Sequence, residues 1–215
     1  MPVQPDSDFE RLERLYATNT RSREVRRVER AALRWFQDIR KGRIPKDLEN
    51  PTAYIPFEEF TRGKKGIYGR PIVGQMFTFR YDAKLKEKLP WWDAQPIAFI
   101  LDVKEDRILS LSLHYLPVRL RLRLVGMIRA TMRSKVLSRE AKAQFTYAMI
   151  KTVSKYRIAK PCIKTHLLSH IKSKIVRIHP RDWLLACALP TDRFMKANRQ
   201  TVWRQTLRDL HGIAR

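Results

Sequence analysis

The chain of 215 residues has only two cysteines, Cys162 and Cys187, which are too few to build a disulfide framework at this length. Acidic residues are also scarce, with 21 Asp and Glu against 45 Lys and Arg. No apolar run approaches the roughly 18 residues of a membrane span, and the first eight residues lack the pattern of a signal peptide. We therefore expect a soluble protein, made in a cytoplasm, with reduced thiols and no membrane partner.

The residues that are present indicate a folded and strongly basic protein. Hydrophobic residues make up 44% of the chain, with five Trp and nine Phe, so we expect a packed core rather than disorder. The formal net charge is +24. This excess predicts a polyanionic partner, with nucleic acid favoured over an anionic membrane. The alternative is a basic protein that self-repulsion keeps in solution.

Most of the positive charge lies between residues 119 and 181. This segment has seventeen basic residues and one acid, Glu140, whereas residues 44–118 have eleven basic residues and ten acids. A continuous polyanion needs such clustering, because each neutralised phosphate releases a counterion. We predict that the segment holds DNA by backbone contacts that do not read sequence. The predicted contacts are Arg119, Arg121, Arg123, Arg129, Arg133, Lys135, Lys160, Lys164, Lys172, Lys174 and Arg177.

Residues 8–41 have the spacing of a helix that is interrupted near residues 17–20. In the second half, Val25, Ala32 and Phe36 recur at helical spacing. The positions between them hold Arg21, Arg23, Arg26, Arg27, Arg30 and Arg34. Because acids are interspersed, two interpretations stay open. Either these arginines contact DNA, or they form the charged face of a helix docked on the core or on another subunit.

The rest of the chain shows both strand and helix patterns. Residues 72–113 are predicted as β, with a hairpin made by residues 97–101 and 108–114. Residues 118–133 fit either a strand or a helix, and we favour a helix because Pro117 suits its first turn. The further predictions are helices at 138–156, 161–173 and 191–210, a strand at 175–178 and a short apolar strand at 183–189.

This order of elements predicts an α+β fold. We expect a small antiparallel β-sheet packed with several helices and preceded by an N-terminal helical arm. The predicted domains are a basic helical arm at residues 1–43, a connector rich in Pro and Gly at 44–71, and an α+β DNA-binding core at 72–215.

The sequence contains one possible metal site. Cys162, His166 and His170 are spaced four apart, which would place them on one face of the predicted helix 161–173. A structural zinc site needs a fourth ligand, which only His179 or Cys187 would supply. The alternative is that the two histidines face phosphate while Cys162 packs inward. We predict no metal and no other cofactor.

Catalysis is a second chemistry to consider. Metal-dependent cleavage of DNA needs converging carboxylates, and nothing in the spacing of Asp82, Asp93 and Asp102 of the β region demands that they converge. No serine has the glycine-flanked setting of a nucleophile elbow. We therefore predict that the protein is not an enzyme and has no small-molecule substrate. Trp91, Trp92 and Tyr81 either stack on bases or belong to the core, and we favour the core.

Several stretches follow one another in an order that resembles a known family. They are residues 76–84 (MFTFRYDAK), 89–93 (LPWWD), 111–117 (LSLHYLP), 160–162 (KPC), 170–174 (HIKSK), 183–190 (WLLACALP), 194–197 (FMKA) and 202–203 (VW). Over about residues 74–205 the chain resembles the DNA end protector proteins of contractile-tailed bacteriophages. One departure is Trp92, where that pattern leads us to expect a Tyr. The resemblance carries no catalytic motif.

The resemblance implies a minor virion protein that binds double-stranded DNA ends and shields them from host exonuclease. It also implies a role in completing the head, with other phage head, neck or tail proteins as partners. Residues 1–43 lie outside it. The alternative function is a structural neck or tail protein whose basic face contacts DNA or an acidic protein ring, and a third is a metal-dependent nuclease.

Overall fold

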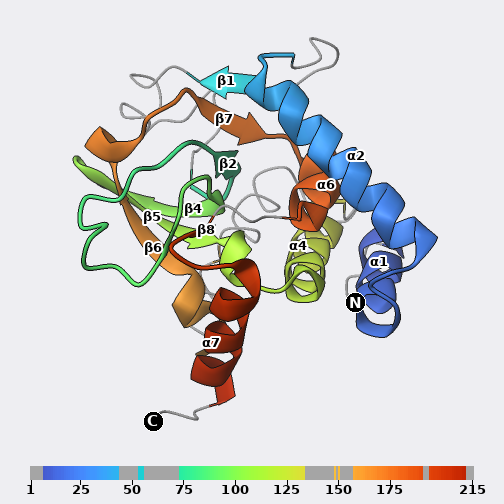
Figure 1. Ribbon diagram of the computed structural model, residues 1–215. Coiled ribbons are helices and arrows are strands. Elements are labelled where there is room, and N and C mark those ends of the chain that lie inside the picture. The colour runs from blue at the N-terminus through green and yellow to red at the C-terminus, as the bar shows by residue number, and fades with distance from the viewer. Residues whose placement is uncertain are drawn as a thin grey trace. The chain divides into compact units, whose positions relative to one another are not determined.

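The computed structural model of the protein describes residues 7–43, 53–55, 73–133, 148, 150, 157–190 and 194–211 (Figure 1). It has helices, a main β-sheet and a second small sheet, so the predicted α+β class is confirmed. Most of the predicted helix 138–156 lies outside the described residues. None of the described helices is long and apolar enough to cross a membrane.

The chain forms two compact units, each assembled from separate stretches of sequence. Unit 1 comprises Met1–Ala53, Leu116–Met149 and Ile178–Pro190, and unit 2 comprises Tyr54–Tyr115, Ile150–Arg177 and Thr191–Arg215. The predicted segments were contiguous, whereas these units interleave along the chain. Residues 119–181, the basic segment, therefore contribute to both units.

Unit 1 begins with the two N-terminal helices, α1 (Ser7–Thr18) and α2 (Arg23–Arg40). The predicted interruption near residues 17–20 is confirmed. The side chain of Ser22 caps α2 by accepting a hydrogen bond from the backbone N–H of Val25 at 3.1 Å. Gly42 follows the helix with φ of 74°, a left-handed conformation that glycine adopts without strain.

The other helices of unit 1 are α4 (Val118–Arg133) and α6 (Trp183–Ala188), which follows the 3-10 turn η4 (Pro180–Asp182). The helix predicted at 118–133 is confirmed, whereas the short strand predicted at 183–189 is wrong. Helix α6 packs against both α4 and α2, and α1 packs on α4 (Figure 1). Gly126 allows that last contact, since a Cβ atom there would lie 2.8 Å from Cβ of Phe9.

Unit 2 is built around the main sheet, whose strand order is β1-β7-β2-β4-β5-β6. Its strands are β1 (Ala53–Ile55), β2 (Met76–Thr78), β4 (Ile97–Val103), β5 (Arg107–Ser112), β6 (Ile163–Leu167) and β7 (Ile175–Ile178). The predicted hairpin is the antiparallel pair β4 and β5. Strand β1 lies within the segment predicted as a connector. A core of Phe77, Phe79, Ile100, Ile108, Leu168 and Ile175 packs in this unit.

The small sheet of unit 2 pairs β3 (Trp92–Asp93) with β8 (Phe194–Met195). The final helix, α7 (Arg199–His211), begins seven residues later than predicted, after Asn198 rather than Thr191. The Asn198 side chain accepts a hydrogen bond from the backbone N–H of Thr201 at 2.9 Å, as an N-cap residue does. Strand β8 occupies part of the stretch that had been assigned to the helix.

The helix predicted at 161–173 is wrong. Residues 157–162 form the 3-10 helix η2, residues 163–167 form β6, and residues 168–170 form the 3-10 turn η3. Strand β6 pairs antiparallel with β5, from Arg107 opposite Leu167 to Leu111 opposite Ile163. Pairing with a distant strand satisfies the backbone here, and an isolated helical pattern cannot reveal such a partner.

Candidate nucleic-acid interface

The predicted DNA contacts do not all lie in one unit. Arg119, Arg121, Arg123, Arg129 and Arg133 belong to α4 of unit 1. Lys160, Lys164, Lys172, Lys174 and Arg177 belong to unit 2, and Lys135 lies outside the described residues. The basic segment is thus divided between two compact units. Its described residues differ in burial and in hydrogen-bond partners.

Arg121 is buried, with 0% of its surface exposed. Its Nε donates to the carbonyl oxygen of Leu116 at 2.7 Å, and its Nη1 donates to that of Leu189 at 3.3 Å and more weakly to that of Cys187 at 3.5 Å. The carbonyls of Cys187 and Leu189 lie at the C-terminal end of α6, where they have no partner within the helix. Arg121 therefore joins α4 to α6 and is enclosed away from a phosphate at the surface.

The other arginines of α4 differ in how far they are engaged within unit 1. Arg129 donates through Nη1 to the carbonyl of Pro180 at 2.9 Å and lies over the ring of Phe9, 5.7 Å from its centroid. Arg119 is exposed and lies 3.7 Å from a carboxylate oxygen of Glu13. Arg123 is exposed. Helix α4 thus offers Arg119 and Arg123 to a ligand, while Arg129 holds α1 and η4.

In unit 2 the predicted lysines and Arg177 also separate into two groups. Lys160, Lys172 and Lys174 are exposed. Lys164 is half-buried with its Nζ 4.1 Å from the centroid of the Tyr115 ring, and burial lowers the pKa of its ammonium group. Arg177 is buried in β7. The three exposed lysines are therefore the members of this set that are most open to solvent.

The three residues considered as zinc ligands occupy different elements, because the helix that would align them is absent. Cys162 is buried at the end of η2, and His170 places Nδ1 2.7 Å from the carbonyl oxygen of Asp82. His166 is buried in β6, and burial lowers the pKa of its imidazole to about 4, so the ring is neutral at pH 7. Among the described residues, no group of three or more His, Cys, Asp or Glu could hold a metal ion.

The carboxylates considered for catalysis have separate partners. The buried Asp93 places Oδ2 2.7 Å from Nδ1 of the buried His114, and the half-buried Asp82 lies 3.3 Å from Nζ of Lys86. Asp102 is exposed at the end of β4. Of the aromatic residues, Trp92 is buried in β3, which confirms its assignment to the core.

A cluster for which the sequence left DNA contact open lies on α2. Arg23, Arg26, Arg27, Arg30 and Arg34 are all exposed, and we call them the arginine face of α2. The buried residues of the same helix are Val25, Ala32, Phe36 and Ile39. At about 100° per residue the five arginines span an arc of about 100° directly opposite the buried residues. The helical spacing predicts this position of the arginines once the buried side of the helix is known.

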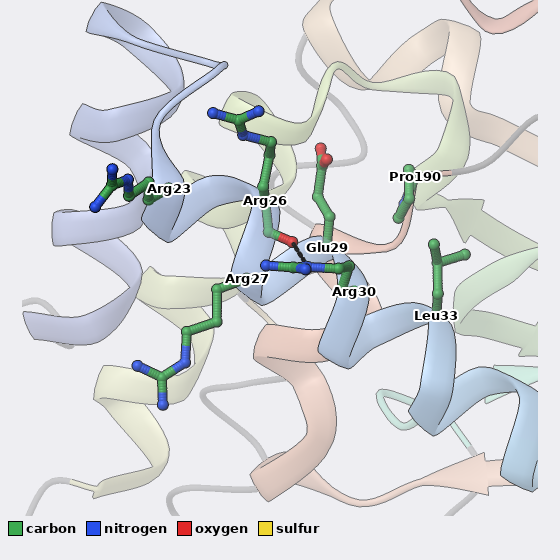
Figure 2. A pocket seen from close by; sticks show the side chains of 7 residues that line it. All are labelled: Arg23, Arg26, Arg27, Glu29, Arg30, Leu33 and Pro190. Carbon is green, nitrogen blue, oxygen red and sulfur yellow. Dashed lines mark hydrogen bonds between the residues drawn. The ribbon is translucent and has the colours of Figure 1, made fainter.

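The arginine face borders an open hollow of about 600 Å³. Its lining consists of Arg23, Arg26, Arg27, Glu29, Arg30, Leu33 and Pro190, all from unit 1 (Figure 2). Figure 2 shows the guanidinium groups of Arg23, Arg26 and Arg27 pointing away from one another, while Nε of Arg30 donates to the carbonyl of Arg26 at 3.3 Å. One acid faces four arginines, so the hollow is an electropositive surface.

Comparison with known proteins identifies one family. The family described as the phage T4 terminal DNA protecting protein matches residues 49–208, which is about three quarters of the chain. No curated protein and no solved structure matches the chain. The matched segment runs from before β1 to residue 208 within α7, and it leaves α1 and α2 outside.

Proposed function

Because the chain belongs to the family of the phage T4 terminal DNA protecting protein, we propose that it is a non-enzymatic virion protein that binds the ends of a packaged linear double-stranded genome. Bound at an end, it shields the duplex from host exonuclease, and it takes part in completing the phage head. The family match is the observation that carries this proposal.

The charge of the chain supports the same function. A net charge of +24 favours association with a polyanion, and arginine and lysine contacts to phosphate hold a duplex without reading its sequence. We infer that those predicted DNA contacts whose side chains are described and exposed make such contacts. They are Arg119 and Arg123 of unit 1 and Lys160, Lys172 and Lys174 of unit 2. Arg121 and Arg129 bind backbone carbonyls of unit 1 instead, and Arg177 is buried.

Shielding an end requires no chemistry. An exonuclease must reach the terminal nucleotides, so a protein that covers the terminus and dissociates slowly is sufficient. Hydrolysis of a phosphodiester by a metal-dependent nuclease would instead need carboxylates that hold a cation beside the scissile phosphate. The carboxylates of Asp93 and Asp82 are engaged with His114 and Lys86, respectively, which supports a binding role.

Degradation of linear duplex DNA by a processive exonuclease tests the proposal. We expect protection that rises with protein concentration, with linear duplex competing for the protein better than circular duplex of the same length. If circular DNA competes as well as linear DNA, the protein binds DNA but does not prefer ends. That result is the one expected of a structural neck or tail protein. Shortening of the DNA by the protein alone with Mg²⁺ would exclude the non-enzymatic function.

A further inference from the structure

We propose that the arginine face of α2 is a binding surface for the sugar-phosphate backbone of duplex DNA. This inference rests on the proposed function and deepens it, because it names a DNA contact outside residues 49–208, the segment that matches the family. The surface comprises Arg23, Arg26, Arg27, Arg30 and Arg34, with Leu33 and Pro190 beside them.

The geometry of α2 makes these five side chains one continuous surface. Arg23 and Arg34 are eleven residues apart, which corresponds to about 16 Å along a helix axis. The opposite side of the helix is buried through Val25, Ala32 and Phe36, so it fixes which way the arginines face. Duplex DNA carries one negative charge per about 1.7 Å of its axis, so this length of helix can meet several phosphates.

The arginine face has no carboxylate partner among the described residues. None of the five arginines forms an ion pair with a carboxylate of the described residues. The nearby acids are engaged elsewhere, since Glu24 pairs with Arg11 at 2.7 Å and Glu29 accepts a hydrogen bond from the Tyr16 hydroxyl at 3.0 Å.

Like charges on this face repel one another. Arg23 and Arg27, Arg26 and Arg30, and Arg30 and Arg34 are each four residues apart, a spacing at which like charges destabilise a helix by about 0.2–0.5 kcal/mol per pair. A bound polyanion would remove this repulsion. The arrangement therefore disfavours an isolated helix and favours a complex with an anionic ligand.

The shape and chemistry of the hollow favour a DNA backbone over other anions. Arginine is weakly hydrated and presents a planar fork of donors that matches phosphate oxygens. The spread guanidinium groups in Figure 2 suit phosphates placed along a chain better than one small anion. Leu33, 40% exposed, and the neighbouring Pro190 supply an apolar surface for deoxyribose.

An acidic protein is the competing partner, and the composition of the hollow disfavours it. Stable protein interfaces have a buried apolar centre with a polar rim. Here the apolar lining is limited to Leu33 and Pro190, and the rest is charged. An interface of this kind resembles protein–DNA interfaces, which are more polar and much more positively charged.

Binding of the full chain to blunt duplex DNA, measured across a range of salt concentrations, tests the proposal. The test variant is Arg27→Gln with Arg30→Gln. The matched control is Arg11→Gln with Arg14→Gln on α1, which removes the same charge from arginines that are already paired with Glu24 and Glu10. Linear 5′-phosphorylated, linear 5′-hydroxyl and circular duplexes are compared, with polyglutamate as a further ligand.

If two phosphate contacts are lost, the slope of log K against log salt should become shallower by about 1.8. That change corresponds to roughly 60-fold weaker binding at 0.1 M salt, with the curves meeting near 1 M. The loss should be equal for all three duplexes, and the control should retain most of the wild-type slope. A slope equal to wild type in the test variant would overturn the proposal.

Two other results would also overturn it. A loss confined to 5′-phosphorylated ends would indicate a terminal-phosphate site, and a loss of polyglutamate binding with DNA binding intact would indicate an acidic protein partner. A measurement on the wild-type chain needs no folded variant: bound DNA should protect Arg27 and Arg30 from a guanidine-modifying dicarbonyl. Equal modification with and without DNA would be incompatible with the proposed contact.

The outcome also distinguishes this inference from the proposed function. If the wild-type chain fails to protect linear DNA from exonuclease, the proposed function is wrong. If the wild-type chain protects the DNA and the test variant protects it equally well, with an unchanged salt slope, only the role of α2 is wrong.

Discussion

Helices α2 and α4 belong to the same unit and are both rich in arginine, yet the two sets of arginines have different surroundings. On α2, five arginines lie opposite the buried side of the helix and are exposed. On α4, Arg121 is fully buried, and Arg129 is engaged with Pro180 and Phe9. The comparison teaches that the density of arginine along a helix does not determine how much charge reaches solvent.

The cause of the difference is the register of each arginine relative to the apolar positions of its helix. Arg121 follows Val118 by three residues and precedes Val125 by four, so it lies on the buried side of α4. Arg26 and Arg30 of α2 bear no such relation to Val25 and Phe36, and they lie on the opposite side. A buried guanidinium needs several acceptors, and the end of α6 supplies them.

The largest expected effect comes from removing the buried arginine. Arg121→Met replaces the aliphatic stem of arginine with an apolar side chain but leaves the carbonyls of Leu116 and Leu189 without their donor. Buried polar groups without partners cost about 1–3 kcal/mol each, so we expect the free energy of unfolding to fall by about 4 kcal/mol. Chemical denaturation measures it. Arg123→Met, on the exposed side of α4, is the control and should change it by less than about 0.5 kcal/mol.

Burial has a different effect on His166 than on Arg121. The buried guanidinium of Arg121 stays charged, whereas burial keeps the imidazole of His166 neutral. Burial lowers the pKa of His166 from 6.5 to about 4, and its ring packs against the edges or faces of Phe79 and Tyr81. The unfolded chain therefore binds a proton more readily than the folded chain. The stability that the neutral ring confers is fully present above pH 6.5 and is lost as the pH falls toward 4.

Denaturation of the wild type and of His166→Gln at pH 7 and pH 4 measures this effect. We expect the wild type to lose up to about 3 kcal/mol more than the variant between the two pH values. Carboxylates also titrate in this pH range, and the difference between wild type and variant cancels their contribution. An identical loss in both proteins would contradict the prediction and place the proton on another group.

The smallest expected effect is on the stability of α2. Arg26→Gln with Arg30→Gln removes exposed charges that repel each other, at the cost of the hydrogen bond from Nε of Arg30 to the carbonyl of Arg26. We expect the free energy of unfolding to stay within about 0.5 kcal/mol of the wild type, or to rise slightly at low salt. Thermal unfolding at two salt concentrations measures it. A loss of several kcal/mol would assign these arginines a structural role like that of Arg121.

Much of the fold was predictable because its signals are local. The interruption between α1 and α2 and the β4–β5 hairpin each follow from spacing within one segment. For helix α4 the spacing fitted either a strand or a helix, and Pro117 at the first turn favoured the helix. The predicted helix at 161–173 failed because β6 gains its backbone partners from β5, more than 50 residues earlier in the chain. The strand predicted at 183–189 was wrong because periodicity cannot distinguish a short buried helix from a buried strand.

The sequence by itself determined that this protein is strongly basic, α+β in class and similar to phage DNA end protectors, because composition, local periodicity and residue order are properties of the chain alone. Only the tertiary structure decided which basic residues are exposed. Arg121 became an internal link between α4 and α6, and residues 119–181 were divided between two compact units. The physical reason is that the exposure of a charge depends on neighbours that are distant in sequence, whereas its presence does not.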